Sequence, residues 1–263
     1  MKKKLDIYDF GKQLLDTLDL DPVYVAIYYA DLPSQRLSKW LVAYWCFYHC
    51  GTASWITDQP NFFVAMEQAA ASKDWSRGSE RRHFRGEQAR KAVADMQRHY
   101  RNPDTIIQMI CGELNEQYTL HQVAEKTKTL RGFGDWIAFK VADMIERLGL
   151  CDVRFRPSDV FQMFESPRLG AELMYSTYGG SGSPYEWAIS SLSSRLSKHK
   201  APPRFERTIN IQELETILCK WKSHMNGHYE VGKDILEVRE GLHKYPNSKT
   251  AKEILLGMKR GNL

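Results

Sequence analysis

The sequence LRGFGDWIAFKVADMIERL, residues 130–148, decides the fold of this chain. Two glycines, Gly132 and Gly134, flank the apolar residue Phe133. Glycine lets a backbone turn sharply and approach a partner closely. From Asp135 onward the apolar residues recur at helical spacing, so the stretch predicts a tight hairpin that opens directly into an amphipathic helix.

The predicted hairpin is suited to bind an anion. Its backbone amides point the same way as the N-terminus of the following helix, and this combination favours a phosphate, usually that of DNA. We therefore expect Arg131, Gly132, Phe133 and Gly134 to contact DNA. The alternative is an ordinary turn between two helices, because glycine is common at helix ends.

Helical periodicity extends over almost the whole sequence. One helix is expected to precede the hairpin at 121–129 and another to follow it at 135–148, where Asp135 can cap it. The other expected helices cover residues 36–50, 61–72, 87–100, 102–113, a stretch from 158 or 159, 210–221 and 229–242. We predict a single all-α domain over 1–263, in which two interleaved lobes enclose a DNA-binding cleft.

Composition narrows the function classes. The net charge is only +5, but residues 73–101 hold nine Lys or Arg against four Asp or Glu, and residues 195–207 hold five against one. Such basic patches suit a nucleic acid partner. No apolar run is long enough to span a membrane. The five cysteines are scattered and no signal peptide is evident, so we expect reduced thiols, no metal site and a cytoplasmic location.

One face of the helix expected at 135–148 carries functional side chains. Ile137, Val141, Ile145 and Leu148 form its apolar stripe, with Ala138 and Ala142 beside them. Trp136, Lys140 and Asp143 fall on the other face, where they could stack a base, balance a phosphate and take a proton. The alternative is a surface ion pair between Lys140 and Asp143.

Cations crowd before the helix expected near Gly86. Arg81, Arg82, His83 and Arg85 stand where guanidinium groups and a helix N-terminus together can bind a polyphosphate. The alternative is a solvated charged loop. No P-loop motif is present, which argues against ATP hydrolysis.

Two further clusters contain candidate functional residues, but their sequence signals are weaker. Trp45 and His49 lie at the end of the buried helix expected at 36–50, where most aromatic residues belong to a core. Lys220 and His224 are four residues apart near a glycine turn, so they could reach one site together.

The hairpin resembles the helix-hairpin-helix of DNA glycosylases, whose hairpin reads Leu-Pro-Gly-hydrophobic-Gly. In that superfamily an aspartate follows the hairpin helix and faces the flipped nucleotide, and Asp159 is in about that place, after a longer loop. Its alternative role is a plain helix cap. Glycosylases that cut the strand have a lysine two residues after the second glycine. This chain has Trp136 there, which excludes Schiff-base chemistry at that position.

Several segments together resemble the phage α-glutamyl/putrescinyl thymine pyrophosphorylases, or amino acid:DNA transferases. The helical domain of phage 5-hydroxymethyluracil DNA kinases is related to them. The resemblance covers residues 35–242. The segments that carry it are WCFYH at 45–49, GTASW at 51–55, RHFRG at 82–86, GFGDWIAFKVAD at 132–143, LCKWK at 218–222 and GHY at 227–229.

The resemblance implies an enzyme that attaches an amine to thymine-derived bases of phage DNA. The 5-hydroxymethyluracil of such DNA is pyrophosphorylated, and an amino acid or polyamine then displaces pyrophosphate from the 5-methylene group. We expect double-stranded modified DNA as the partner, the cytoplasm of an infected bacterium as the location and no cofactor, with a role for Mg²⁺ left open.

The family reaction assigns roles to the residues identified above. Asp159 or Asp143 would deprotonate the incoming ammonium, together with Lys140 as a catalytic cation. The extruded base would stack on Trp136, Trp45 or His49. The leaving pyrophosphate would be held by Arg82, His83 and Arg85, with Lys140 and Lys220 as further candidates.

Two other functions remain open at the level of sequence. A monofunctional DNA glycosylase would use the same hairpin, with Asp159 stabilising an oxocarbenium ion. A non-catalytic DNA-binding module would need only the hairpin and the basic patches. The cation cluster before Gly86 indicates a phosphorylated substrate, and this argues against the glycosylase.

Overall fold

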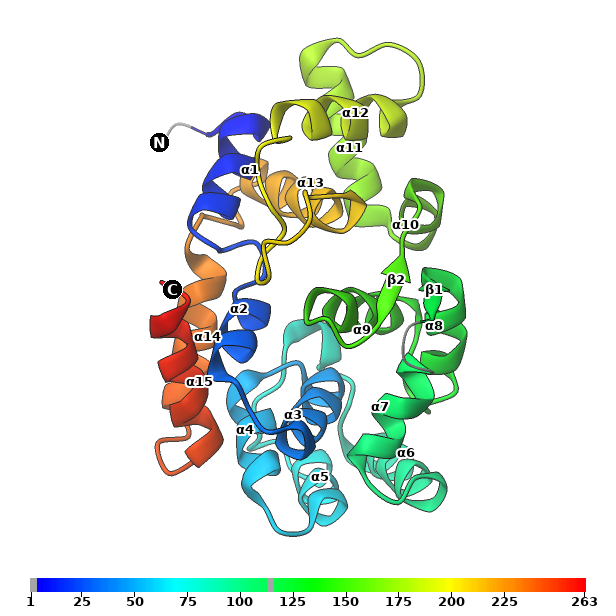
Figure 1. Ribbon diagram of the computed structural model, residues 1–263, viewed down its shortest axis with the longest axis vertical. Coiled ribbons are helices and arrows are strands. Elements are labelled where there is room, and N and C mark those ends of the chain that lie inside the picture. Colours follow the sequence, from blue (N-terminus) through cyan, green and yellow to red (C-terminus); the bar gives the residue numbers. More distant parts are fainter. Residues whose placement is uncertain (1–3, 113–115) are drawn as a thin grey trace.

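The computed structural model describes residues 4–112 and 116–263, and it is built almost wholly of helices (Figure 1). The all-α prediction is therefore confirmed. The α-helices are α1 Ile7–Asp16, α2 Pro22–Ala30, α3 Ser34–Phe47, α4 Cys50–Asp58, α5 Phe62–Ala71, α6 Gly86–His99, α7 Pro103–Cys111, α8 Leu120–Lys128, α9 Asp135–Arg147, α10 Pro157–Met163, α11 Glu165–Tyr178, α12 Pro184–Arg195, α13 Ile211–Met225, α14 Lys233–His243 and α15 Lys249–Arg260. The predicted helix end at Glu113 lies outside the described residues.

The hairpin forms between α8 and α9, as predicted. Gly132 has a φ of +82°, a backbone conformation that glycine adopts without steric cost. Gly134 is the N-cap of α9, and no side chain caps this helix. The prediction that Asp135 caps it is wrong, because Asp135 is already its first residue and its carboxylate binds Lys128 at 3.0 Å.

Two short strands close the base of the hairpin. β1 Gln117–Thr119 precedes α8, and β2 Asp152–Arg154 follows α9. They pair in parallel with Tyr118 opposite Val153, so the outer ends of the two helices are held together by backbone hydrogen bonds. Thr119 also starts α8 with a reciprocal capping box to Gln122.

The buried helix predicted at 36–50 is broken in the structure. α3 ends at Phe47, Tyr48 takes a φ of +50°, and α4 begins at Cys50. The imidazole of His49 caps α4, since its Nδ1 accepts a hydrogen bond from the Thr52 amide at 3.1 Å. The break turns the backbone, so that Tyr48 and His49 lie at a pocket instead of continuing a core helix.

Helices from both ends of the chain pack together. α15 lies on α2 and α4, and α14 packs on the same two helices, beside the N-terminal half in Figure 1. The contact is close: a Cβ on Gly51 would fall 2.1 Å from the Gly241 carbonyl oxygen, so only glycine fits there. This approach brings α14 over the residues that follow α3.

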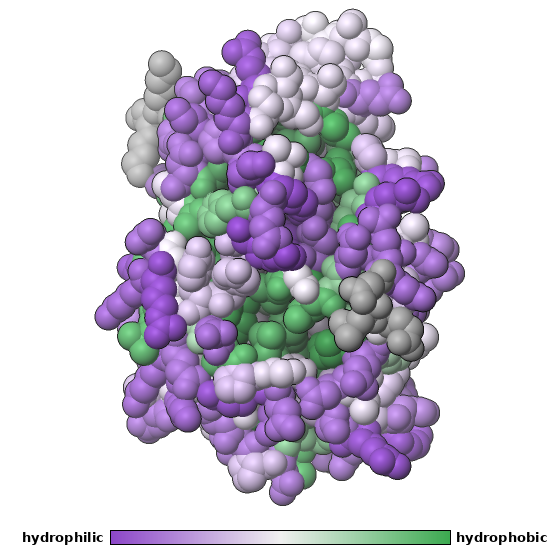
Figure 2. Space-filling view, in the orientation of Figure 1, coloured by the Kyte–Doolittle hydropathy of each residue, from purple (hydrophilic) through white to green (hydrophobic). Residues whose placement is uncertain are grey.

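The face seen in Figure 2 has hydrophobic side chains in a hollow across its middle, with hydrophilic side chains above and below. The helices of the described chain are all too short or too polar to cross a bilayer.

Candidate active site

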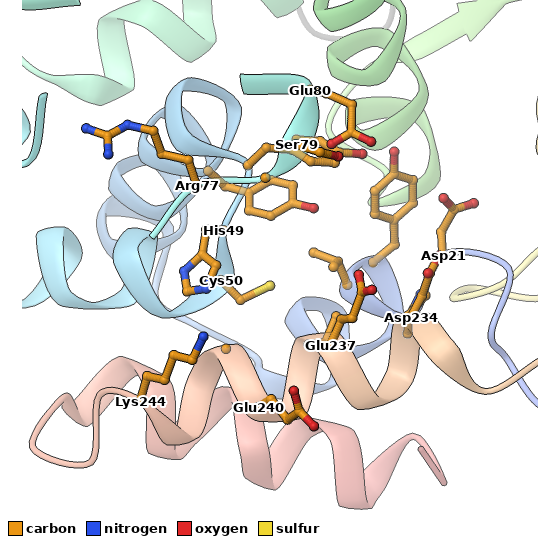
Figure 3. A pocket seen from close by; sticks show the side chains of 18 residues that line it. Asp21, His49, Cys50, Arg77, Ser79, Glu80, Asp234, Glu237, Glu240 and Lys244 are labelled. Carbon is orange, nitrogen blue, oxygen red and sulfur yellow. The ribbon is translucent and has the colours of Figure 1, made fainter. Parts of the chain in front are cut away.

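A pocket of about 450 Å³ lies between the N-terminal helices and α14 (Figure 3). Its walls come from the start of α2, the end of α3, the start of α4, residues 77–80 and the inner face of α14. These segments are far apart in the sequence, and the packing of α14 on α2 and α4 brings them together.

Tyrosine rings form the inner wall of the pocket. Tyr44 and Tyr48 lie 4.8 Å apart between ring centroids, and Tyr24 faces the pocket from α2. Burial raises the pKa of all three phenols, so they stay neutral and keep a proton that they can donate. Aromatic faces in a sheltered pocket can bind a cation.

The rest of the lining is mostly acidic. Five carboxylates contribute to it, namely Asp21, Glu80, Asp234, Glu237 and Glu240, against the two cations Arg77 and Lys244. Arg77 is committed elsewhere, because its guanidinium donates to the carbonyls of Phe84, Trp75, Ala69 and Ser72. Asp21 is already paired with Arg147, and Asp234 with Lys220. The other three carboxylates still outnumber the two cations, so the pocket suits a ligand that carries an ammonium group better than it suits a polyphosphate.

Lys220, predicted to hold pyrophosphate, has a structural role here. Its ammonium donates to the carbonyls of Asp19 and Leu20 at 2.6 and 2.7 Å and to the Asp234 carboxylate at 2.6 Å. All three N–H donors are thus in use. The predicted pairing with His224 is also wrong, because His224 binds the backbone of Leu5 and Tyr229.

Asp143 and Lys140 are not on an exposed face of α9. Asp143 is fully buried and accepts hydrogen bonds from the Tyr24 hydroxyl at 3.0 Å and from Gln212 at 3.2 Å. Burial raises the pKa of Asp143 to about 7. Asp143 can therefore reach the pocket only through Tyr24, and the alternative of a surface ion pair with Lys140 is wrong.

Lys140 lies nearby in the interior of the protein. Its ammonium is 3.8 Å from the buried Glu215 carboxylate, and its side chain is only 12% exposed. Burial alone would lower its pKa, but the carboxylates of Glu215 and Asp21 outweigh it, so the pKa is raised and Lys140 stays charged.

The three predicted base-stacking residues differ in position. Trp45 is 1% exposed and belongs to the core, so it has no face for a base. His49 lines the pocket, where burial and the charge of Lys244 lower its pKa to about 4. Trp136 is half-buried in the first turn of α9, and its ring lies 4.8 Å from Tyr48 on the pocket wall.

The hairpin leaves backbone donors free at the surface. In residues 4–112 and 116–263, neither the Gly132 amide nor the Gly134 amide donates a hydrogen bond. Both glycines are exposed, and a Cβ on Gly134 would meet nothing within 4 Å. Phe133 instead packs into the core, and Arg131 is half-exposed and binds Asp95 at 3.2 Å.

Arg81, expected with the cations before Gly86 to bind a polyphosphate, is instead buried and joins the hairpin to the pocket rim. It follows the pocket residue Glu80, and its buried guanidinium donates to the carbonyls of Gly132 at 2.8 Å and Cys46 at 3.0 Å. The group also lies over the rings of Phe84 and Phe133. Any nucleic acid on the hairpin is thereby placed close to the pocket.

Apart from the buried Arg81, the predicted cation cluster forms an exposed turn directly before α6. Arg82, His83 and Arg85 all face solvent. Over the described parts of the chain, His83 and Arg85 make no salt bridge and no side-chain hydrogen bond, and Arg82 binds only the Ser79 carbonyl. The turn adjoins the hairpin, since a Cβ on Gly132 would be 3.8 Å from the Phe84 ring.

Asp159 lies apart from the pocket. It is half-buried in the first turn of α10, where it accepts a hydrogen bond from the Ser158 hydroxyl at 3.3 Å. The N-cap of α10 is Arg156, so Asp159 is not the plain cap of the alternative reading. It does not line the pocket, and among the described residues it forms no hydrogen bond or ion pair with Asp143 or Lys140.

Cysteines near the pocket are held as thiols. Burial raises the pKa of Cys46 and Cys50 to about 12, which keeps both protonated. Among the described residues, no group of three or more His, Cys, Asp or Glu side chains is arranged to hold a metal ion.

Comparison with known proteins identifies the family. A family model described as amino acid:DNA transferase matches residues 11–228. The chain belongs to the amino acid:DNA transferase family. Such an enzyme transfers an amine onto DNA, so a base-releasing glycosylase and a non-catalytic DNA-binding module are both set aside.

Two phage proteins are similar to this transferase along most of its length. A glycinyltransferase of Pseudomonas phage PaMx11 is 37% identical, with 97% of each chain covered. A putrescinyltransferase of Delftia phage PhiW-14 is 27% identical, over 90% of this chain and 78% of that protein. The family match ends before α14, which supplies the outer wall of the pocket in this transferase.

Proposed function

We propose that this transferase joins an amine to the 5-methylene carbon of pyrophosphorylated 5-hydroxymethyluracil in phage DNA, within an infected bacterium. In the reaction, the amine nitrogen forms a bond to that carbon while the bond from carbon to the pyrophosphate oxygen breaks. Pyrophosphate leaves with the electron pair, and the donor ammonium gives its proton to a carboxylate of the pocket.

One observation carries this proposal: the acidic, tyrosine-lined pocket adjoins the hairpin. Tyr48 of the pocket contacts Trp136 of α9, and Arg81 links the pocket rim to Gly132. DNA phosphates would bind the free amides of Gly132 and Gly134. The extruded base would then stack at Trp136, with its 5-methylene group turned toward the pocket.

Different side chains would bind the leaving pyrophosphate and the extruded nucleotide. Beside the N-terminus of α6, Arg82, His83 and Arg85 form no salt bridge with any described residue, and we assign the pyrophosphate to them. Asp159 is proposed to face the extruded nucleotide, as the family resemblance implies. Lys140 would act from behind Tyr48 as a buried positive charge and not as a contact to substrate.

We propose glycine as the donor, because the relative that covers 97% of both chains is a glycinyltransferase. The test is to incubate the protein with DNA bearing 5-pyrophosphoryloxymethyluracil, glycine and putrescine. Nucleosides are then analysed by mass spectrometry and released pyrophosphate is assayed. A glycyl-modified nucleoside with equimolar pyrophosphate is expected. Free base and abasic sites, or DNA left unchanged, would refute the proposal.

A further inference from the structure

α14 presents two opposite charges to the pocket. Glu237 and Lys244 both line it, and both side chains point into it in Figure 3, with Lys244 on the side of His49. Lys244 continues the helical backbone as the C-cap of α14. Seven residues are about two helical turns and roughly 10 Å of rise, so the two side chains share one face.

These two groups keep their charges available. Among the residues described, Lys244 makes no salt bridge and no side-chain hydrogen bond, and Glu237 has only an exposed pair with Lys233 at 3.8 Å. Such a pair contributes little binding energy. The neighbouring Asp234 differs, because the Lys220 ammonium already neutralises it.

The pocket therefore has an acidic region and a basic end. Glu237 faces the cavity with Glu80 across from it, near the tyrosine rings (Figure 3). Lys244 supplies a positive charge beside His49, which is uncharged near neutral pH. The backbone rise between the two residues is roughly 10 Å, and a small zwitterion between them would turn its ammonium toward Glu237 and its carboxylate toward Lys244.

We infer that Glu237 and Lys244 select the donor of the transfer reaction proposed above, and that they select an α-amino acid over a diamine. Glu237 binds the donor ammonium and takes one of its protons, and the lone pair that this frees on the nitrogen then attacks the 5-methylene carbon as pyrophosphate leaves. Lys244 binds the donor carboxylate. A diamine has a second cation in place of that carboxylate, and Lys244 repels it.

The position of the two residues in the chain supports a role in selection. Both follow residue 228, where the family match ends, whereas the hairpin and the cation turn lie inside it. A substitution in α14 can change which amine is transferred without changing the affinity for DNA.

A competition experiment tests this inference. Wild type, Lys244→Gln, Lys244→Glu, Glu237→Gln and Arg239→Gln are each given pyrophosphorylated DNA with equal concentrations of glycine and putrescine. Arg239 is the matched control, because it is an exposed cation of the same helix that does not line the pocket. Product ratios, the KM for each donor and DNA affinity are measured, with thermal unfolding to confirm folding.

Wild type and Arg239→Gln should give mainly the glycyl product. Lys244→Gln should raise the KM for glycine roughly tenfold, as expected for the loss of a charged contact, and Lys244→Glu should reverse the product ratio toward putrescine. Glu237→Gln should raise the KM for both amines and lower kcat, with DNA affinity unchanged. An unchanged ratio in both Lys244 variants, or putrescine preferred by wild type, overturns the inference. Wild type that forms no aminated product refutes the proposed reaction itself.

Discussion

The guanidinium of Arg81 donates a hydrogen bond of 2.8 Å to the carbonyl oxygen of Gly132. A second bond from the same group reaches Cys46 at the end of α3. The hairpin is thus tied to the helix that leads into the pocket, by a side chain that is only 8% exposed. One buried side chain thus connects the hairpin to the pocket rim.

Arg81→Ala should therefore loosen the hairpin and destabilise the protein. Removing hydrogen bonds from a buried charged group to two carbonyls costs about 2–4 kcal/mol in unfolding free energy. Urea unfolding measures this, with Arg82→Ala as the control, because Arg82 is exposed and should stay within about 0.5 kcal/mol of wild type. Equal midpoints for both variants would show that the link to Gly132 carries no stability.

Arg85→Ala should weaken binding to pyrophosphorylated DNA about tenfold more than binding to plain DNA. Its guanidinium is exposed and makes no side-chain bond in the described structure, so its charge is free for the ligand. Affinities must be compared at one salt concentration. The control is Arg98→Ala, a cation on the same helix α6 that already pairs with Asp95. Equal losses on the two DNAs would make Arg85 a general phosphate contact.

Lys220→Met should lower the stability of the protein and leave its affinity for pyrophosphorylated DNA unchanged. The change removes the bonds to Asp19, Leu20 and Asp234, and we expect a loss of about 2–3 kcal/mol in unfolding free energy. Lys222→Met, two residues along the same helix, should be nearly neutral. A fully stable Lys220→Met protein that lost affinity only for pyrophosphorylated DNA would restore the role predicted from sequence.

The features predicted correctly from sequence are local. The hairpin and the bounds of α9 follow from glycine spacing and from the apolar repeat at 137, 141 and 145, which need no knowledge of distant segments. The cation turn before Gly86 is local in the same way. Each of these signals lies within about twenty residues of chain.

The pocket could not be predicted in this way. Glu237 and Lys244 meet Asp21 and Tyr24 only because α14 packs on α2, more than 200 residues away in the sequence. Asp143 shows the same limit: helical spacing places it opposite the apolar stripe, but α2 and α13 cover that side and bury it. Periodicity tells which residues share a face of a helix, and not what packs on that face.

His49 gives a prediction about pH. Burial and the charge of Lys244 lower its pKa to about 4, below its ordinary 6.5. The folded protein therefore favours neutral imidazole, so the stability from His49 is fully present above pH 6.5 and is lost as the pH falls through 4. His49→Asn removes this titration and keeps an acceptor for the Thr52 amide. The difference in unfolding free energy between wild type and variant should fall by roughly 2–3 kcal/mol from pH 7 to pH 4.

The same residue can be observed directly by NMR. The His49 imidazole should titrate near pH 4 in the folded protein, and addition of glycine should raise that midpoint, because a carboxylate bound at Lys244 reduces the positive charge beside the ring. Parallel stability curves for the two proteins, or a midpoint near 6.5, would mean that solvent reaches His49 freely. In that case water would enter the pocket more freely than its geometry indicates. Water would screen the charge of Lys244, which would then select the donor more weakly.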